Sequence, residues 1–291
     1  MPKRSTLLAA WFCCALFAVA ARAELRKDIE FAKPNGFSLT LDAYVPEGAG
    51  PFPTVIIVHG GGFARGDKQT YVPPLFEPLT QAGFAWFTIN YRMHPQYKFP
   101  DAIDDVEAAV SFVKAHAKEY KVDLRHVVLM GESAGGTLVS FVGVRNKSAI
   151  KLAAVVPFYG VHDWQQRAEE DAAGNPRPSV WREFFSVPPG NSPEAIKRMR
   201  EVSATSYIKK GLPPFLLIHG TKDEQVNYQQ SVMMQQRMKQ AGNVCDLITV
   251  EGGPHGMGVI NNFPDTKVKM IVWLKNRLKV KTPSYRGAIQ N

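Results

Sequence analysis

Hydrophobic and polar positions divide the chain into short segments that predict strands and helices in turn. Two strand-like runs lie near residues 25–31 and 37–44, and Pro34-Asn35-Gly36 between them favours a tight turn. The remaining expected strands are continuous apolar runs, typical of strands buried on both faces, at residues 54–58, 84–89, 127–130, 153–156, 215–218 and 247–250. We expect an antiparallel pair followed by a largely parallel sheet.

Two longer segments have the spacing of helices. In residues 100–120, Ile103, Val106 and Val110 recur every three or four positions behind an acidic first turn, and residues 266–278 form the expected last helix. Strands that alternate with helices imply an α/β fold, here a mostly parallel, doubly wound sheet with helices on both faces.

Residues 158–212 interrupt this alternation. The segment has no strand-like run, and it contains Trp164, Trp181 and Phe184 among charged residues and prolines. We interpret it as a cap-like insertion beside the edge of the sheet where such folds bind ligands. The alternative is a surface excursion whose aromatic residues pack only on the core.

The two ends of the chain differ from its middle. Residues 1–23 combine a basic start, a short apolar run and Ala21-Arg22-Ala23, which is typical of a signal peptide cleaved after Ala23. An uncleaved membrane anchor is the alternative, although the apolar run is shorter than the ~20 residues that a span needs. We expect the mature chain to be a secreted or periplasmic domain at 24–291, with a basic tail at 280–291.

Composition excludes several classes of protein. The 291 residues carry a net charge of +9, and 45% of them are hydrophobic, as in a globular domain. No basic cluster is interleaved with aromatic residues, so we expect no nucleic-acid partner. We also expect no stable membrane insertion once the signal peptide is cleaved. Cys245 is the one cysteine outside the predicted signal, and no His/Cys cluster predicts a metal site. The oligomeric state stays open.

The stretch Gly131-Glu132-Ser133-Ala134-Gly135 directly follows the expected strand at 127–130. A G-x-S-x-G sequence between a strand and a helix predicts a strained turn that exposes the serine hydroxyl. Ser133 is therefore the candidate nucleophile. The alternative is a flexible glycine loop without chemistry.

His59-Gly60-Gly61-Gly62 follows the expected strand at 54–58. Consecutive glycines allow backbone N–H groups to turn toward one point, as an oxyanion requires. We expect donors from Gly61, Gly62 and Ala134, and a structural role for His59. An ordinary flexible turn is the alternative.

A serine nucleophile needs a base, and the base needs an acid. His255, in the glycine-rich "GGPHGMG" after the last expected strand, is the candidate base, whereas His219 is interpreted as a packing residue. Asp223, after the strand at 215–218, is the candidate acid, with Glu224 as its rival. The order Ser133, Asp223, His255 is the order expected for this fold.

These motifs resemble the α/β-hydrolase superfamily. "HGGGF", "GESAGG", "PPFLLIHGTKDEQV" and "PHGMG" look like hormone-sensitive-lipase-like esterases, and even more like secreted bacterial carbohydrate esterases that remove acetyl and feruloyl groups from xylan. The similarity extends over residues 36–280 and includes "HGGG-x-x-x-G-x-K" at 59–68 and a "YR…FP…DD" segment at 91–105. Residues 157–213, with "WREFFSVPPG", depart from that group and leave acyl and alcohol specificity open.

The resemblance implies a secreted serine esterase that works through an acyl-enzyme without a cofactor. Its substrates would be short-chain or aromatic acyl esters, on small molecules or on plant polysaccharide. The candidate substrate-binding residues are Phe63, Trp164, Trp181 and Phe184. A lactone or natural-product ester hydrolase, a prolyl-oligopeptidase-like peptidase and a non-catalytic binding protein are the alternatives.

Overall fold

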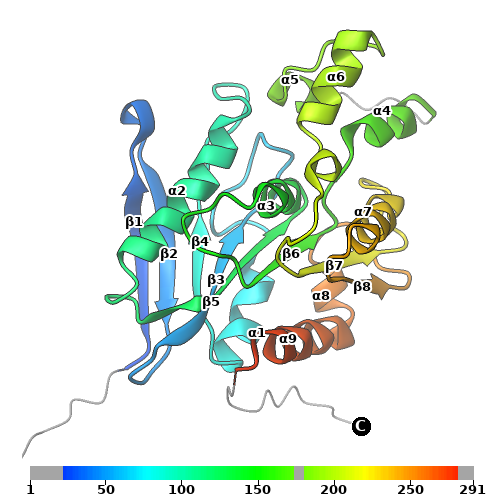
Figure 1. The fold of residues 1–291 in the computed structure, drawn as a ribbon. Coiled ribbons are helices and arrows are strands. Elements are labelled where there is room, and N and C mark those ends of the chain that lie inside the picture. The colour runs from blue at the N-terminus through cyan, green and yellow to red at the C-terminus, as the bar shows by residue number, and fades with distance from the viewer. Residues whose placement is uncertain (1–21, 174–179, 281–291) are drawn as a thin grey trace, which may run out of the picture.

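A single eight-stranded sheet runs through the computed structural model, which describes residues 22–173 and 180–280 (Figure 1). The strand order across the sheet is β1-β2-β4-β3-β5-β6-β7-β8. The strands are β1 (Glu24–Ala32), β2 (Leu39–Val45), β3 (Phe52–Val58), β4 (Ala85–Ile89), β5 (Val122–Glu132), β6 (Ala154–Phe158), β7 (Phe215–Gly220) and β8 (Cys245–Val250).

The strand directions follow the sequence pattern. β1 pairs antiparallel with β2, and β2 pairs antiparallel with β4, whereas every pairing from β4 across to β8 is parallel. Asn35 and Gly36, at the β1–β2 turn, have φ of 50° and 82°, which the Asn-Gly pair tolerates. The predicted α/β fold with an antiparallel pair and a mostly parallel sheet is confirmed.

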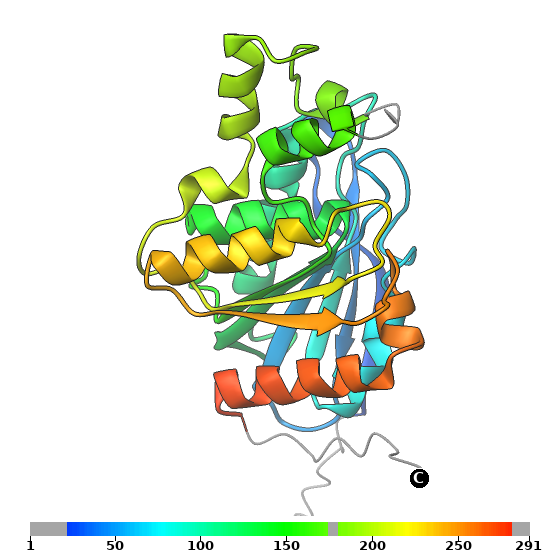
Figure 2. The ribbon, with the colours of Figure 1, turned by 90° about the vertical axis from the view of Figure 1, so that its right-hand side faces the viewer.

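Helices cover both faces of the sheet (Figure 2). One face is covered by α2 (Asp101–Ala115), α3 (Ala134–Arg145) and α7 (Gln229–Gln240), and the other by α1 (Phe76–Gln81), α8 (Gly258–Asn261) and α9 (Pro264–Leu278). The buried apolar residues accordingly form two clusters, one on each side of the sheet. Among the described helices, none is long and apolar enough to cross a membrane.

One expected helix boundary differs from the structure, and one helix has no counterpart among the expected elements. The helix expected at 100–120 ends at Ala115, where His116 leaves the helical conformation, and residues 116–121 form turns that pass through Lys121, whose φ is +51°, into β5. The polar segment "QQSVMMQQRMKQ" carries no clear apolar stripe, yet it forms α7 and buries Met234 and Met238.

The insertion between β6 and β7 contains α4 (Trp164–Ala173), α5 (Val180–Phe184), α6 (Pro193–Glu201) and the 3-10 helix η3 (Ala204–Tyr207). These helices lie above the sheet at the top of Figure 1. The carboxyl ends of the parallel strands lie at the same edge of the sheet. The insertion is therefore beside the loops that carry the candidate catalytic residues.

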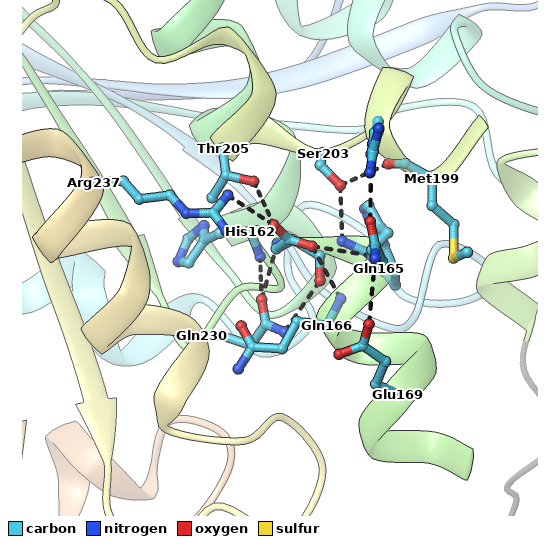
Figure 3. A network of polar contacts seen from close by, with 12 residues as sticks. His162, Gln165, Gln166, Glu169, Met199, Ser203, Thr205, Gln230 and Arg237 are labelled. Atoms are coloured by element: carbon cyan, nitrogen blue, oxygen red, sulfur yellow. Dashed lines mark hydrogen bonds and ion pairs between the residues drawn. The ribbon is translucent and has the colours of Figure 1, made fainter. Parts of the chain in front are cut away.

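A polar network attaches the insertion to the sheet domain (Figure 3). Asp163 accepts hydrogen bonds from Thr205 at 2.9 Å and Arg237 at 3.0 Å, and the Gln230 side chain accepts from the Asp163 backbone N–H at 2.9 Å. The network therefore fixes the start of α4 against η3 and α7. The predicted signal peptide lies outside the described residues except for Arg22 and Ala23, as does the basic tail beyond Val280.

Candidate active site

Ser133 occupies a strained turn between β5 and α3. Its backbone has φ 51° and ψ −116°, a conformation that costs on the order of 1–3 kcal/mol and is found at functional sites. Its N–H donates to the carbonyl of Phe158 at 3.0 Å. A Cβ on Gly135 would lie 2.2 Å from the carbonyl oxygen of Val58, so glycine is required where this turn approaches β3. The turn is the one that the G-x-S-x-G pattern predicts.

The three candidate catalytic side chains meet in one hydrogen-bonded chain. The Ser133 hydroxyl donates to His255 Nε2 at 3.0 Å, and His255 Nδ1 donates to Asp223 Oδ2 at 2.6 Å. The side chain of Asp223 is fully buried, and that of His255 is 11% exposed. The ends of β5, β7 and β8 thus bring together residues that are 122 and 32 positions apart in sequence. Glu224, the rival acid, is exposed.

Asp223 is held ionised by several donors. Its Oδ1 accepts from the backbone N–H groups of Gln225 and Val226, each at 2.8 Å. Burial alone would raise the pKa of Asp223, but hydrogen bonds from His219 and His255 hold that pKa well below its usual range. A carboxylate in this state can orient the imidazole of His255 and stabilise its charged form.

His219 has a closer relation to the site than the packing role expected from the sequence. This buried side chain lies 3.2 Å from Asp223 Oδ2 and 3.1 Å from the carbonyl of Val226 through Nε2. Its Nδ1 accepts from the hydroxyl of Ser231 at 2.8 Å, which fixes the N–H on Nε2. The spacing gives a partial signal, since His219 lies next to the last residue of β7 and four residues before Asp223.

The glycine loop after β3 presents backbone donors to the same place. Gly61 and Gly62 have φ of 101° and 64°, and both line the cavity beside Ser133 together with Ala134. Neither Gly61 nor Gly62 donates its N–H to another residue in the described part of the chain. The N–H groups of Gly61 and Gly62 are therefore available for an oxyanion, and Ala134, the first residue of α3, is the third expected donor.

The residues around this loop hold it in place. His59 is buried, stacks on Tyr91 with ring centroids 4.4 Å apart, and donates through Nδ1 to the carbonyl of Gly60 at 2.8 Å. Burial lowers the pKa of His59 to about 4, so the ring is neutral. Further along, the Lys68 ammonium lies 2.7 Å from Asp28 and 2.9 Å from Asp42, which ties the end of the loop to β1 and β2. These contacts explain the histidine and lysine of the "HGGG-x-x-x-G-x-K" motif.

Glu132 is a buried carboxyl beside the nucleophile, and the sequence pattern alone indicates no role for it. Glu132 is 3% exposed. Its carboxyl packs directly against Gly60, since a Cβ at position 60 would lie 2.0 Å from Glu132 Oε1. Burial raises the pKa of Glu132 to about 7, although the charge of His255 and the N–H of Gly60 oppose the rise. A carboxyl that titrates near neutral pH thus lies behind the catalytic residues.

A cavity of about 400 Å³ opens onto Ser133 and His255. Three of the four predicted substrate-binding residues line it: Phe63, Trp164 and Trp181. Phe184 does not: it is fully buried and stacks on Phe63 with centroids 4.5 Å apart, so it supports the wall from behind. Arg167 and Asp171 also line the cavity and pair with each other at 2.8 Å, and Trp181 donates to the same carboxylate at 3.1 Å.

Within the described residues, no group of three or more His, Cys, Asp or Glu side chains is arranged to hold a metal ion.

The chain matches known proteins over most of its length. The family model described as BD-FAE matches residues 41–238. The sequence is 30% identical over 192 residues to LipM of Mycobacterium tuberculosis, described as a "Probable carboxylic ester hydrolase", covering 62% of this chain and 44% of that protein. The chain spans about half the length of the curated relatives it matches, with 44%, 54% and 46% for three of them.

Solved structures share the fold. A bifunctional GH43-CE protein of Bacteroides eggerthii superposes with a TM-score of 0.76 and 26% identity, over 87% of this chain and 35% of the other. Esterase 2 of Thermogutta terrifontis superposes with a TM-score of 0.71 and 25% identity, over 90% and 97% of the two chains. The latter protein has also been solved phosphorylated by paraoxon.

Proposed function

The chain belongs to the BD-FAE family, and on this premise we propose that it is a serine hydrolase of carboxylic esters. The observation that carries the proposal is the hydrogen-bonded chain from Ser133 through His255 to Asp223, next to the free N–H groups of Gly61 and Gly62. A nucleophile, a base, its orienting acid and an anion site within one cavity are what acyl transfer requires.

The reaction follows from the arrangement of these groups. His255 Nε2 takes the proton of Ser133 as its Oγ attacks the ester carbonyl, and the oxygen that becomes negative accepts from the N–H groups of Gly61, Gly62 and Ala134. The imidazolium, stabilised by Asp223, returns the proton to the departing alcohol and leaves an acyl group on Ser133. Water activated by His255 then releases the acid and restores the serine.

We propose that the acyl group is short or aromatic and lies against the aromatic wall of the cavity. Phe63, Trp164 and Trp181 give this wall flat apolar surface, and a volume of about 400 Å³ suits a small acyl group with part of its alcohol. The similarity to a GH43-CE protein supports a polysaccharide as the carrier of the ester. The signal-like residues 1–23 support export to the periplasm or the medium.

A substrate panel tests this assignment. The wild type, Trp164→Ala and Trp181→Ala would be compared on matched acetyl, butyryl and feruloyl esters, acetylated xylan and a lactone. We expect both variants to change the relative rates among the acyl groups, because each removes part of the wall. Trp273→Ala is the matched control, because it also removes a tryptophan. Trp273 lies on α9, in the cluster on the face of the sheet away from Trp164 and Trp181, and its loss should leave the acyl ratios unchanged.

Two results would contradict the assignment. Unchanged acyl ratios in both cap variants would show that the wall does not contact the acyl group. Preference for the lactone over every open-chain ester would reject the proposed substrate class while leaving the serine mechanism intact.

A further inference from the structure

A second cavity, of about 410 Å³, lies at the far end of α3 and has no part in the chemistry described above. We call it the basic cavity, because Arg145, Lys147, Arg198 and Lys209 line it, with Glu201 as the one acidic lining residue. Arg145 is the last residue of α3, and Ser133 caps its start. At 1.5 Å per residue, the 12 residues of the helix separate the two by about 18 Å.

The positive charge of the basic cavity is only partly balanced. Arg198 pairs with Glu201 at 3.3 Å, and Arg145 lies near Glu107, a carboxyl whose pKa is raised by burial against the influence of that arginine. Lys147 and Lys209 are exposed, and their ammonium groups form no hydrogen bond or ion pair with any residue from 22 to 173 or from 180 to 280. An anion entering the cavity would therefore meet unpaired cations.

Aromatic rings form the apolar part of the cavity. Phe141 packs edge-on against Phe99 and Tyr207, with centroids 5.3 and 5.2 Å apart. Arg198 lies 5.4 Å above the Phe99 ring, and its Nε donates to the carbonyl of Phe185 at 2.7 Å. Arg145 lies 5.7 Å from the centre of the Phe141 ring. The two guanidinium groups thus cover the faces of Phe99 and Phe141, and the ring of Tyr207, which is 37% exposed, is the apolar surface left for a ligand.

The combination of unpaired cations and an exposed aromatic ring favours some classes of ligand over others. A simple inorganic anion would use the cations but not the ring of Tyr207, whereas a neutral sugar would use that ring but not the unpaired charge. A uronic acid uses both, since its ring has an apolar face of C–H groups and its carboxylate suits arginine and lysine donors. We propose that the basic cavity binds a uronic acid residue of an acidic polysaccharide.

The position of the cavity connects it to the ester site. Phe185 packs 5.3 Å from Phe63 in the catalytic wall and 5.4 Å from Phe99 in the basic cavity, so one aromatic cluster backs both. A polymer held at the basic cavity would raise the effective concentration of its esters near Ser133. This step extends the proposed function, because the bound uronic acid would belong to the polymer that carries the ester.

Direct binding measurements test the proposal without requiring hydrolysis. The full chain would be titrated by calorimetry with an ester-free xylo-oligosaccharide bearing a glucuronic acid, with its neutral counterpart, and with inorganic phosphate. We expect the acidic oligosaccharide to bind about tenfold or more tightly than either of the others, and to weaken as salt rises from low to physiological ionic strength.

Variants locate the binding. The double variant Lys147→Ser/Lys209→Ser should lose about tenfold in affinity for the acidic oligosaccharide. Lys118→Ser/Lys269→Ser, an equal loss of charge at exposed positions elsewhere, should bind as the wild type does. Arg65→Ser removes a cation that lines the catalytic cavity and should also bind as the wild type does.

Several outcomes would overturn the proposal. Equal affinity for acidic and neutral oligosaccharides, or for phosphate, would show that the cavity does not recognise a uronic acid. Loss of affinity in Arg65→Ser or in the control pair, and not in Lys147→Ser/Lys209→Ser, would place the binding elsewhere. Because the ligand carries no ester, these results stand apart from the substrate panel, whose failure would instead reject the ester hydrolase assignment.

Discussion

Replacing Glu132 with glutamine should remove a pH-dependent penalty on folding. The side chain is buried next to Ser133, and its pKa rises from 4.5 to about 7 in the folded chain. Well below pH 4.5 the carboxyl is neutral in both the folded and the unfolded state, so it contributes no penalty. As the pH rises toward 7, the unfolded chain releases the proton first, and the folded state loses stability until its own carboxyl ionises.

The size of the effect follows from the two pKa values. With 4.5 in the unfolded chain and about 7 in the native one, linkage predicts that Glu132 lowers the free energy of unfolding by about 2.5 kcal/mol between pH 5 and pH 8. Glutamine has nearly the same shape and does not titrate. The Glu132→Gln variant should therefore gain about 2.5 kcal/mol relative to the wild type over that interval.

Urea unfolding at pH 5, 6, 7 and 8, followed by circular dichroism, measures this difference. Glu47→Gln, at an exposed position, is the control, and its difference from the wild type should stay constant. A Glu132→Gln difference that stays constant across the four pH values would refute the reasoning, because it would mean that the buried carboxyl titrates alike in both states.

Two further predictions concern groups that support the catalytic residues. Gly61→Ala should lower kcat by about 10²–10³-fold, because a Cβ there would lie 1.9 Å from the carbonyl oxygen of Arg65 and displace the donor loop. Gly62→Ala, with open space at its Cβ, is the matched comparison, and equal losses in both would contradict the steric argument. His219→Leu should lower kcat about tenfold with little change in KM, because Asp223 loses a donor. Steady-state kinetics with an aryl acetate check both, and an unchanged kcat in His219→Leu would show that this histidine only packs.

Features that depend on a few neighbouring residues could be predicted from the sequence. The Asn-Gly turn, the apolar runs of the sheet and the strand-to-helix turn at Ser133 are local, and the structure has each where the pattern places it. The meeting of Asp223 with His255 could also be anticipated, because parallel strands end at one edge of the sheet.

Features that depend on side-chain direction could not be predicted. Phe184 lies on the short helix α5, and nothing in the irregular cap sequence indicates that its ring turns inward to support Phe63. The spacing places His219 near Asp223, but the direction of its ring toward that carboxylate depends on packing around β7. The helix α7 is too polar for its periodicity to be recognised, since its neighbours rather than its composition stabilise it.

The most direct test of the account is covalent labelling of the nucleophile. Paraoxon phosphorylates a serine that a neighbouring base activates. Esterase 2 of Thermogutta terrifontis, a similar structure, has been solved phosphorylated by paraoxon. Incubation of the wild type followed by peptide mass spectrometry should show one diethylphosphoryl group, on Ser133, with loss of aryl acetate hydrolysis in the same proportion. Ser133→Ala should remain unlabelled and inactive. Labelling at another residue, or activity that persists in a fully labelled protein, would contradict the assignment of Ser133 as the nucleophile.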